Sequence, residues 1–303
     1  MLRNSNRFLA IQGGGGMFDI KKVCIIGGDL RQVYLGQALT EDGLYVTYAA
    51  LELCDDAQPD YAGIDTAVTR CDTVILPMPL SKDGKTLYTP LSDIEIPLDE
   101  NFAAMLRGKR VFCTNSKLLN STGDYSSTEL YDYLKREELA VLNAVPTAEG
   151  AIAAAVYNTP VTIHGSRCLV AGFGRIGKLL ARDLFALGAK VTVSARRSSD
   201  IAWIKACGYS AVKTCDIKDS GEYDIIFNTI PEMIFTESTL KTAAKNALVI
   251  DLASKPGGVD LAACERLHIK AEAVLSLPGK TAPKTAALII KDTIYNTARE
   301  ENP

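Results

Sequence analysis

The chain has 303 residues, of which 47% are hydrophobic and 23% are charged, and its formal net charge is −3. This length accommodates two globular domains, each able to bury its own core. The small net charge gives no reason to expect nucleic acid as a partner, and no apolar run reaches the roughly 18 residues that span a membrane. Two histidines in the whole chain argue against a His-based metal site, so no metal is expected.

The cysteine pattern and the N-terminal segment indicate the cellular compartment of the protein. Eight cysteines are scattered without a Cys-x-x-Cys pair, which predicts free thiols in a reducing cytoplasm rather than a disulfide framework. Residues 1–16 have no amphipathic period, end in four glycines and lack the apolar core and cleavage site of a secretory signal. We expect this segment to be an extension that is disordered or foreign to the natural protein, with Met17 as the natural first residue.

The first half alternates strands with helices. Short apolar runs predict strands at 22–27, 44–49, 73–76 and 110–114, and a further short strand near Val141. Helices are expected over 30–39 and 129–137. Strands separated by helices need crossover connections, so the sheet should be parallel. Residues 17–147 are therefore interpreted as a small α/β domain that holds the substrate.

The second half repeats this alternation. The Ala-rich segment 149–157 predicts a helix that ends before Pro160. A second series follows, with strands expected at 167–172, 190–195, 211–213, 223–228, 248–251 and 271–275, and helices at 176–187, 199–207 and 283–299. Residues 148–282 should form one domain, and the helix within 283–303 is expected to pack back on the first domain.

A glycine motif between the strand at 167–172 and the next helix carries the strongest functional signal. The first glycine allows a tight turn, the second lets a pyrophosphate approach the backbone, and the third lets the helix pack on the strand. The helix N-terminus then offers free N–H groups to phosphate. The alternative is a purely structural glycine turn. The predicted cofactor loop consists of Gly172, Phe173, Gly174, Arg175, Ile176 and Gly177.

This motif makes residues 148–282 a Rossmann domain. The predicted fold class is α/β, with two Rossmann-like, doubly wound parallel-sheet domains and an interdomain cleft. In such sheets ligands bind at the carboxyl ends of the strands.

The cofactor is predicted to be NADP. In an NAD site the next strand ends near a carboxylate that binds the ribose, but here Ser194 is followed by Arg196 and Arg197 with no carboxylate at the strand end. Arginine forms paired, charge-assisted hydrogen bonds with phosphate, which suits the 2′-phosphate of NADP. The alternative is a solvated basic turn.

Two later loops are expected beside the same cofactor, because they follow strands whose carboxyl ends share one edge of the sheet. By themselves they would be ordinary strand-to-loop connections. The residues assigned to the nicotinamide half are Asn228, Thr229, Ile230 and Pro231 in the first loop, and Leu252, Ala253 and Ser254 in the second.

The first half has its own glycine turn, which lacks a third glycine at the usual spacing and is not expected to hold a dinucleotide. It suits a carboxylate instead, through backbone N–H groups and cationic or amide side chains. A plain structural turn with its arginine in solvent is the alternative. The proposed substrate-binding residues here are Gly28, Asp29, Arg31 and Gln32.

Together these segments resemble the A subunit of dipicolinate synthase. The resemblance runs from about residue 21 to 294, is loose over 90–138, and leaves residues 1–16 outside. It rests on the serial order of the segments 27–32, 149–151, 162–166, 172–177, 228–231, 251–258 and 277–286.

The resemblance implies an NADP-dependent oxidation of dihydrodipicolinate, or of its hydrated precursor, to dipicolinate (pyridine-2,6-dicarboxylate), as a branch from lysine biosynthesis in spore-forming bacteria. The partner that it implies is a flavoprotein-like B subunit, and a homo-oligomer is possible. The two-domain layout is also similar to that of 2-hydroxyacid and alanine dehydrogenases.

A dianionic substrate calls for two cationic or N–H-rich anchors, for which Arg31 and Lys284 are the candidates. Lys284 and Glu149 are the candidate catalytic residues, Glu149 as the base; alternatively Glu149 is a first-turn carboxylate that suits the helix dipole. His164 and His268 are interpreted as structural or exposed. Two other functions stay open: another NADP-dependent dehydrogenase of a small carboxylate, and a non-catalytic NADP-binding regulatory protein.

Overall fold

The computed structural model describes residues 20–54, 60–219 and 222–300. The expected extension over 1–16 and the expected start at Met17 lie outside these residues. The described chain divides into two compact units. Unit 1 comprises residues 20–27, Gly36–Tyr133 and residues 291–300, and unit 2 comprises Gly28–Leu35 and Leu134–Ile290.

Unit 1 is built on a parallel sheet of five strands in the order β2-β1-β3-β4-β5. The order reverses at β1, as in doubly wound sheets, and the first glycine turn follows that strand. The strands are β1 (Lys22–Ile26), β2 (Tyr45–Ala49), β3 (Thr73–Ile75), β4 (Arg110–Cys113) and β5 (Glu129–Asp132). The helices are α1 (Leu30–Glu41), α2 (Ile64–Arg70), α3 (Glu100–Met105) and α4 (Ser116–Thr122), of which α1 starts in unit 2.

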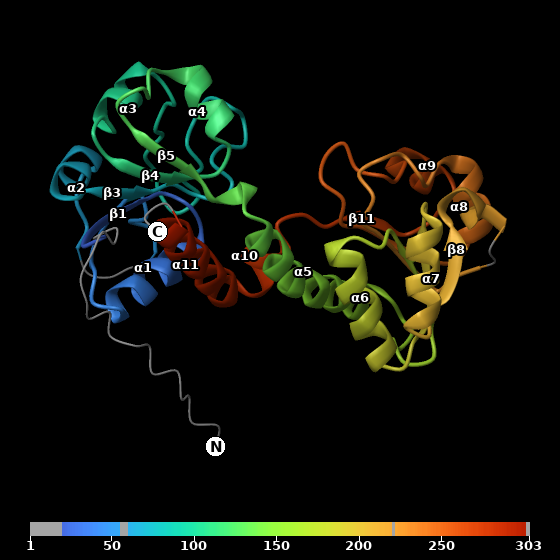
Figure 1. Ribbon diagram of the computed structural model, residues 1–303. Coiled ribbons are helices and arrows are strands. Elements are labelled where there is room, and N and C mark those ends of the chain that lie inside the picture. The colour runs from blue at the N-terminus through green and yellow to red at the C-terminus, as the bar shows by residue number, and fades with distance from the viewer. Residues whose placement is uncertain (1–19, 55–59, 220–221, 301–303) are drawn as a thin grey trace. The chain divides into compact units, whose positions relative to one another are not determined.

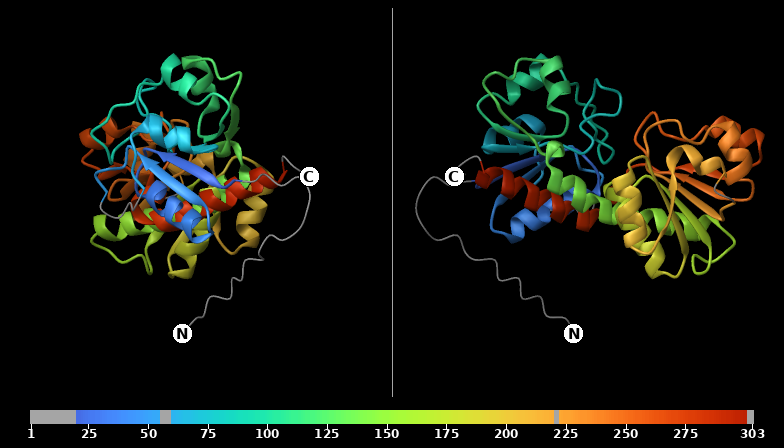
Figure 2. Two further views of the ribbon diagram at one scale, coloured as in Figure 1. Left: turned by 90° about the vertical axis from the view of Figure 1, so that its left-hand side faces the viewer. Right: turned by 45° about the vertical axis from the view of Figure 1, so that its right-hand side comes forward.

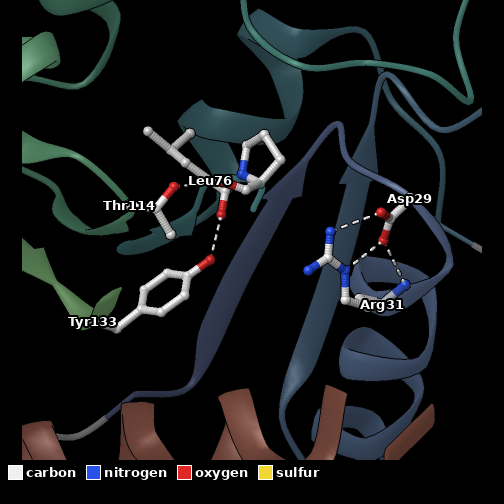
Figure 3. A network of polar contacts seen from close by, with 6 residues as sticks. Asp29, Arg31, Leu76, Thr114 and Tyr133 are labelled. Atoms are coloured by element: carbon white, nitrogen blue, oxygen red, sulfur yellow. Dashed lines mark hydrogen bonds and ion pairs between the residues drawn. The ribbon is translucent and has the colours of Figure 1, made fainter. Parts of the chain in front are cut away.

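One face of this sheet is covered by α2, α3 and α4, whose buried residues Val68, Phe102 and Leu119 pack in one core with Cys24 and Val74 of the strands. Figure 1 shows α3 and α4 over the sheet. At the carboxyl end of β3, side chains bond the loop carbonyls: the Tyr133 hydroxyl donates to the Leu76 carbonyl and the Thr114 hydroxyl to the Pro77 carbonyl, both at 3.1 Å (Figure 3). These bonds hold the strand ends of unit 1 in place.

The helix expected over 129–137 is wrong, because residues 129–132 form β5. Every residue of β5 pairs with β4, from Arg110 with Glu129 to Cys113 with Asp132. The rings of Phe112 and Tyr131 also stack with centroids 5.2 Å apart. Pairing with a neighbouring strand and cross-strand packing outweigh the helix propensity of this segment.

Unit 2 is built on a parallel sheet of six strands in the order β11-β10-β9-β6-β7-β8, so that the order reverses at β6. The strands are β6 (Arg167–Ala171), β7 (Lys190–Ala195), β8 (Ser210–Lys213), β9 (Ile225–Asn228), β10 (Leu248–Asp251) and β11 (Ala271–Ala273). All six lie where the sequence predicts strands: β7 and β10 have the predicted boundaries, and the others differ by one or two residues. This is the expected doubly wound, Rossmann-like arrangement.

Helices cover both faces of the second sheet (Figure 1). The core on one face joins Ala148, Leu180 and Ile204 to the strands, and the core on the other joins Leu240 and Ala263. The helices on the first face are α5 (Glu137–Asn158), α6 (Arg175–Ala186) and α7 (Ser198–Ala206); those on the second are α8 (Glu237–Ala243) and α9 (Leu261–Arg266). A 3-10 segment, Thr214–Asp219, follows β8.

Helix α5 corrects two expectations. The strand predicted near Val141 lies inside this helix, and the helix begins twelve residues before Glu149. Pro146 lies in its interior. A proline removes one backbone hydrogen bond, but Leu139, Pro146 and the small residues around them are buried, so packing keeps the helix continuous. Glu149 is therefore not a first-turn carboxylate, and the helix-dipole role suggested for it is wrong.

Among the described helices α5 is also long and apolar enough to cross a membrane by length and composition. The expectation that no segment reaches that length is therefore wrong on this criterion. Its buried residues Ala148, Ala151 and Ala155 belong to the core beneath the sheet of unit 2. That packing accounts for the buried part of the helix, whereas Val141, Leu142 and Val156 are exposed.

Two helices close the chain, α10 (Leu277–Thr281) and α11 (Pro283–Glu300). The expected last helix is confirmed as α11. In its second half, the buried Lys291 ammonium lies 2.8 Å from an Asp42 carboxylate oxygen just after α1, and the Tyr295 hydroxyl donates to the same oxygen at 2.9 Å. This part of α11 therefore lies beside the end of α1 (Figures 1 and 2).

Candidate functional site

A cavity of about 400 Å³ opens at the carboxyl ends of three strands of unit 2. It is lined by Gly172 directly after β6, Ala195 at the end of β7 and Thr229 directly after β9. These strands flank the point where the strand order reverses, which is where open α/β sheets bind their ligands. The predicted glycine loop and basic turn are thus brought to one pocket.

The three glycines of the loop have three different physical requirements. Gly172 has a φ of +101°, and a Cβ there would lie 2.4 Å from the Thr229 hydroxyl oxygen. A Cβ on Gly177 would lie 2.1 Å from the Gly172 carbonyl oxygen, so the helix can approach the strand only without a side chain. A Cβ on Gly174 would meet nothing within 4 Å. The protein's own packing therefore explains two of the glycines but not Gly174.

The other residues of the loop point in different directions. Phe173 lines the cavity. The Arg175 guanidinium is bonded to Glu137 of α5 at 2.8 and 2.6 Å, and Ile176 packs on the core of unit 2. Gly174 is the N-cap of α6 and supplies no side-chain capping bond, so the first N–H groups of α6 rely on another acceptor.

The basic turn after β7 carries carboxylate partners that the sequence analysis did not identify. Arg197 donates to both carboxylate oxygens of Asp200, at 2.8 and 3.2 Å, and this bonding raises the pKa of the Arg197 guanidinium. Arg196 approaches Glu232 at 3.4 Å. Asp200 lines the cavity together with both arginines, so the pocket does contain a carboxylate, five residues beyond the strand end.

Two hydroxyls near this turn are buried without a hydrogen-bond partner in the part of the chain that the structure describes. They belong to Ser194, within β7, and Thr214, directly after β8. Thr214 also lines the cavity. An unpaired buried hydroxyl is costly, by about 1–3 kcal/mol, so a partner supplied by a ligand would be favourable.

The loops after β9 and β10 are tied together by a buried network. The Asn228 amide donates to Asp251 at 2.8 Å and to the Ile230 carbonyl at 3.0 Å. Asp251 also accepts from the backbone N–H groups of Ala253 and Gly258. The Asn228 side chain is therefore committed to shaping the loop, and its neighbours Thr229, Ile230 and Pro231 line the cavity.

Leu252, Ala253 and Ser254 do not line this cavity. Leu252 and Ala253 are buried, whereas Ser254 is exposed. The role expected for them along the nicotinamide half stays a prediction.

The site suits a dinucleotide on physical grounds. Open space above Gly174 lets a pyrophosphate reach the backbone, and the uncapped start of α6 provides N–H donors. The lining residues also include Arg196, Arg197 and Thr214, whose buried hydroxyl has no partner within the described residues. The residues that would hold the cofactor are Gly172, Phe173, Gly174, Arg196, Thr214, Thr229 and Ile230.

The first glycine turn presents a buried arginine and a buried amide. Asp29 caps α1 by accepting from the Arg31 backbone, and its carboxylate receives the Arg31 guanidinium at 2.9 and 2.8 Å (Figure 3). Arg31 is 4% exposed, so the alternative of an arginine in solvent is wrong. Gln32 is fully buried beside Gly28, and both polar atoms of its amide have no partner within the described residues.

Three of the segments that carry the resemblance, 27–32, 149–151 and 277–286, meet at this turn inside unit 2. A Cβ on Gly279 of α10 would lie 2.8 Å from the Arg31 Nε atom, and a Cβ on Gly150 of α5 would lie 2.9 Å from the Thr281 hydroxyl. Helix α10 is therefore held between the Asp29–Arg31 pair and the middle of α5. The side chains of Glu149 and Lys284 are exposed.

Both histidines are exposed, which agrees with their interpretation as structural or exposed residues. His164 is exposed, with its Nδ1 atom 3.3 Å from the Leu187 carbonyl, and His268 is exposed after α9. Within the described ranges no three His, Cys, Asp or Glu residues are placed to share a metal ion.

The chain is similar to known proteins in both sequence and structure. Residues 22–134 match the family model of the N-terminal domain of the dipicolinate synthase A subunit. The chain is 32% identical over 288 residues to the A subunit of dipicolinate synthase from Bacillus subtilis strain 168, a match covering 92% of this chain and 96% of that protein. The crystal structure of the dipicolinate synthase A subunit from Bacillus halodurans is 32% identical and has a TM-score of 0.82, covering 93% of this chain and 99% of that one.

The fold is also shared more widely. A structure of L-alanine dehydrogenase has a TM-score of 0.58 at 12% identity and covers 90% of this chain and 88% of its own. At that identity the likeness concerns the fold alone. It agrees with the fold of two Rossmann-like domains expected from the sequence.

Proposed function

This chain belongs to the family of dipicolinate synthase A subunits, and from that premise we propose that it oxidises dihydrodipicolinate, or its hydrated precursor, to dipicolinate with NADP⁺ as the oxidant. The observation that carries the proposal is the cavity of unit 2, where Gly174 leaves open space in front of the uncapped start of α6. When bound, the nicotinamide ring accepts a hydride from the substrate ring. The substrate ring also loses a proton and becomes aromatic, and the hydrated precursor in addition loses one molecule of water.

The protein's part is to place a dianion and accept a proton. Arg31 is preorganised by Asp29 and can bond a substrate carboxylate, while the unpaired Gln32 amide offers a donor and an acceptor next to it. Lys284 is the proposed second anchor and catalytic cation. Glu149, an exposed carboxylate away from the helix ends, is the proposed proton acceptor.

The test is direct. The purified chain is mixed with NADP⁺ and enzymatically generated dihydrodipicolinate, and the aromatic product is followed by its ultraviolet absorbance together with NADPH. We expect both to form in equal amounts. Binding of NADP⁺ without any turnover would instead indicate a regulatory protein, and turnover of other small carboxylates alone would indicate a different dehydrogenase.

The cofactor preference is a separate prediction. NADP(H) should bind more tightly than NAD(H), because the basic turn of Arg196 and Arg197 lines the cavity and provides a guanidinium group for a 2′-phosphate. The double variant Arg196→Ala/Arg197→Ala should lose most of this preference, by about tenfold or more, as each charge-assisted bond contributes about 1.5–3 kcal/mol. Calorimetric titration with the four nucleotides measures it. Equal affinities of the unmodified protein for NADPH and NADH would contradict the prediction.

We further propose that the chain works in the cytoplasm with a flavoprotein-like B subunit and forms homo-oligomers. All eight cysteines are free thiols, which suits a reducing compartment. The relatives are each named as one subunit of a synthase, which supports a partner of a different sequence.

A further inference from the structure

A second cavity, of about 380 Å³, adjoins the cofactor cavity in unit 2 and shares Arg196 and Thr214 with it. Its other polar lining includes Lys213 and Thr239. In the sheet, Lys213 at the end of β8 is the register partner of Ala195 at the end of β7. The end of β7 is the place where a Rossmann domain holds the ribose of the adenosine half. The second cavity therefore lies next to the position of the ribose 2′ group.

The three cationic side chains around this position differ in their carboxylate partners. The Nε and Nη2 atoms of Arg197 both donate to the carboxylate of Asp200, which lines the same pocket. Arg196 has a longer contact of 3.4 Å with Glu232. Lys213 has no carboxylate within ion-pair distance among the described residues. Asp200 would also repel a phosphate placed against Arg197, because both carry negative charge.

The hydroxyl of Thr214 is a second, independent feature of this position. It is buried, it lines both cavities, and it has no hydrogen-bond partner within the described part of the chain. A phosphate oxygen would satisfy this donor and would be bonded by the neighbouring cations at the same time.

We propose that Arg196, Lys213 and Thr214 form the subsite for the 2′-phosphate of the cofactor, and that Arg197 serves to fix the turn through Asp200. The proposal rests on the proposed function, since it takes NADP(H) as the cofactor. The sequence alone assigns the selectivity for NADP(H) to Arg196 and Arg197. The proposed subsite keeps Arg196 and adds Lys213, at the end of β8, and Thr214, directly after it.

The experiment uses two ligands that differ only in the 2′-phosphate: adenosine 2′,5′-bisphosphate and adenosine 5′-monophosphate. Their dissociation constants are measured by calorimetry at one salt concentration for the full chain and its variants. Lys213→Met should weaken the bisphosphate about tenfold and change the monophosphate less than about twofold. Lys218→Met removes an equal charge from the 3-10 segment that follows β8, outside the residues that line the two cavities, and should change neither.

Thr214→Val is the second test and separates a ligand-binding role from a structural one. Because the hydroxyl is buried and unpaired, its removal should leave the melting temperature unchanged or raise it, while the bisphosphate binds several-fold more weakly. Thr214→Ser keeps the hydroxyl and should keep the affinity. Arg197→Ala should weaken the bisphosphate less than Lys213→Met does.

Two results would overturn the subsite. If the unmodified protein prefers the bisphosphate and Lys213→Met keeps that preference in full, the subsite is wrong while the NADP assignment stands. If the unmodified protein binds both ligands equally, the NADP assignment fails and the subsite with it.

Discussion

Replacing Gly174 by valine should strongly weaken cofactor binding while the protein stays folded. The position has a φ of −84°, which valine adopts readily, and a Cβ there meets no protein atom within 4 Å. A branched side chain would instead fill the space through which a pyrophosphate reaches the N–H groups of α6. We expect the dissociation constant for NADPH to rise by about a hundredfold or more, since several charge-assisted bonds are lost together.

Melting temperature and calorimetric titration check this prediction together. The cost in stability should stay near 1 kcal/mol, because valine is a poorer N-cap than glycine. The matched contrast is Gly177→Val, where a Cβ would lie 2.1 Å from the Gly172 carbonyl oxygen, so that variant should be strongly destabilised. A folded Gly174→Val protein that binds NADPH normally would refute the assignment of the loop.

Arg31→Ala should lower kcat/KM for the dicarboxylate by about ten- to a hundredfold and leave NADPH affinity unchanged within about twofold. The loss corresponds to one charge-assisted, paired contact of about 1.5–3 kcal/mol. Cofactor affinity is spared because Arg31 does not line the cofactor cavity. Arg31→Lys should not restore activity, since an ammonium lacks the fork that bonds both Asp29 oxygens.

Gln32→Met keeps this prediction testable if the Arg31 variants unfold. The Gln32 amide is buried and unpaired, so removing it should cost no stability, yet KM for the substrate should rise. Lys284→Ala should also reduce substrate use, but less than Arg31→Ala. Lys245→Ala, an exposed charge elsewhere in unit 2, serves as the control. Normal kcat/KM in Arg31→Ala would leave the first glycine turn with a structural role only.

Local pattern was sufficient for most strands and for the cofactor loop. The apolar runs at β1, β6 and β10 are short and continuous, as is typical of buried parallel strands. It failed at residues 129–132 and near Val141. There the outcome depends on partners distant in sequence: β4 for the first segment, and the buried surroundings of α5 for the second.

The residues of the candidate site also fall into those that a local pattern predicts and those that it does not. Gly172, Gly174 and Gly177 could be recognised because the requirement for glycine is local to one turn. Asp200 and Lys213 could not, because neither lies at the end of the strand that carries the basic turn. Asp200 lines the cofactor cavity because it lies in the first turn of α7. Lys213 lines the adjoining cavity because β8 pairs with β7.

The sequence by itself determined that this protein has α/β architecture, a glycine-rich cofactor loop and membership of a recognisable family, because each depends on residues close together in the chain. Only the tertiary structure decided which side chains meet. It brought Gly279 and Arg31 together although they lie far apart in the chain, and it placed Arg196 3.4 Å from Glu232. It also left the amide of Gln32 and the hydroxyl of Thr214 buried and unpaired within the described residues. Burial and pairing are properties of the packed chain, so no local pattern of residues encodes them.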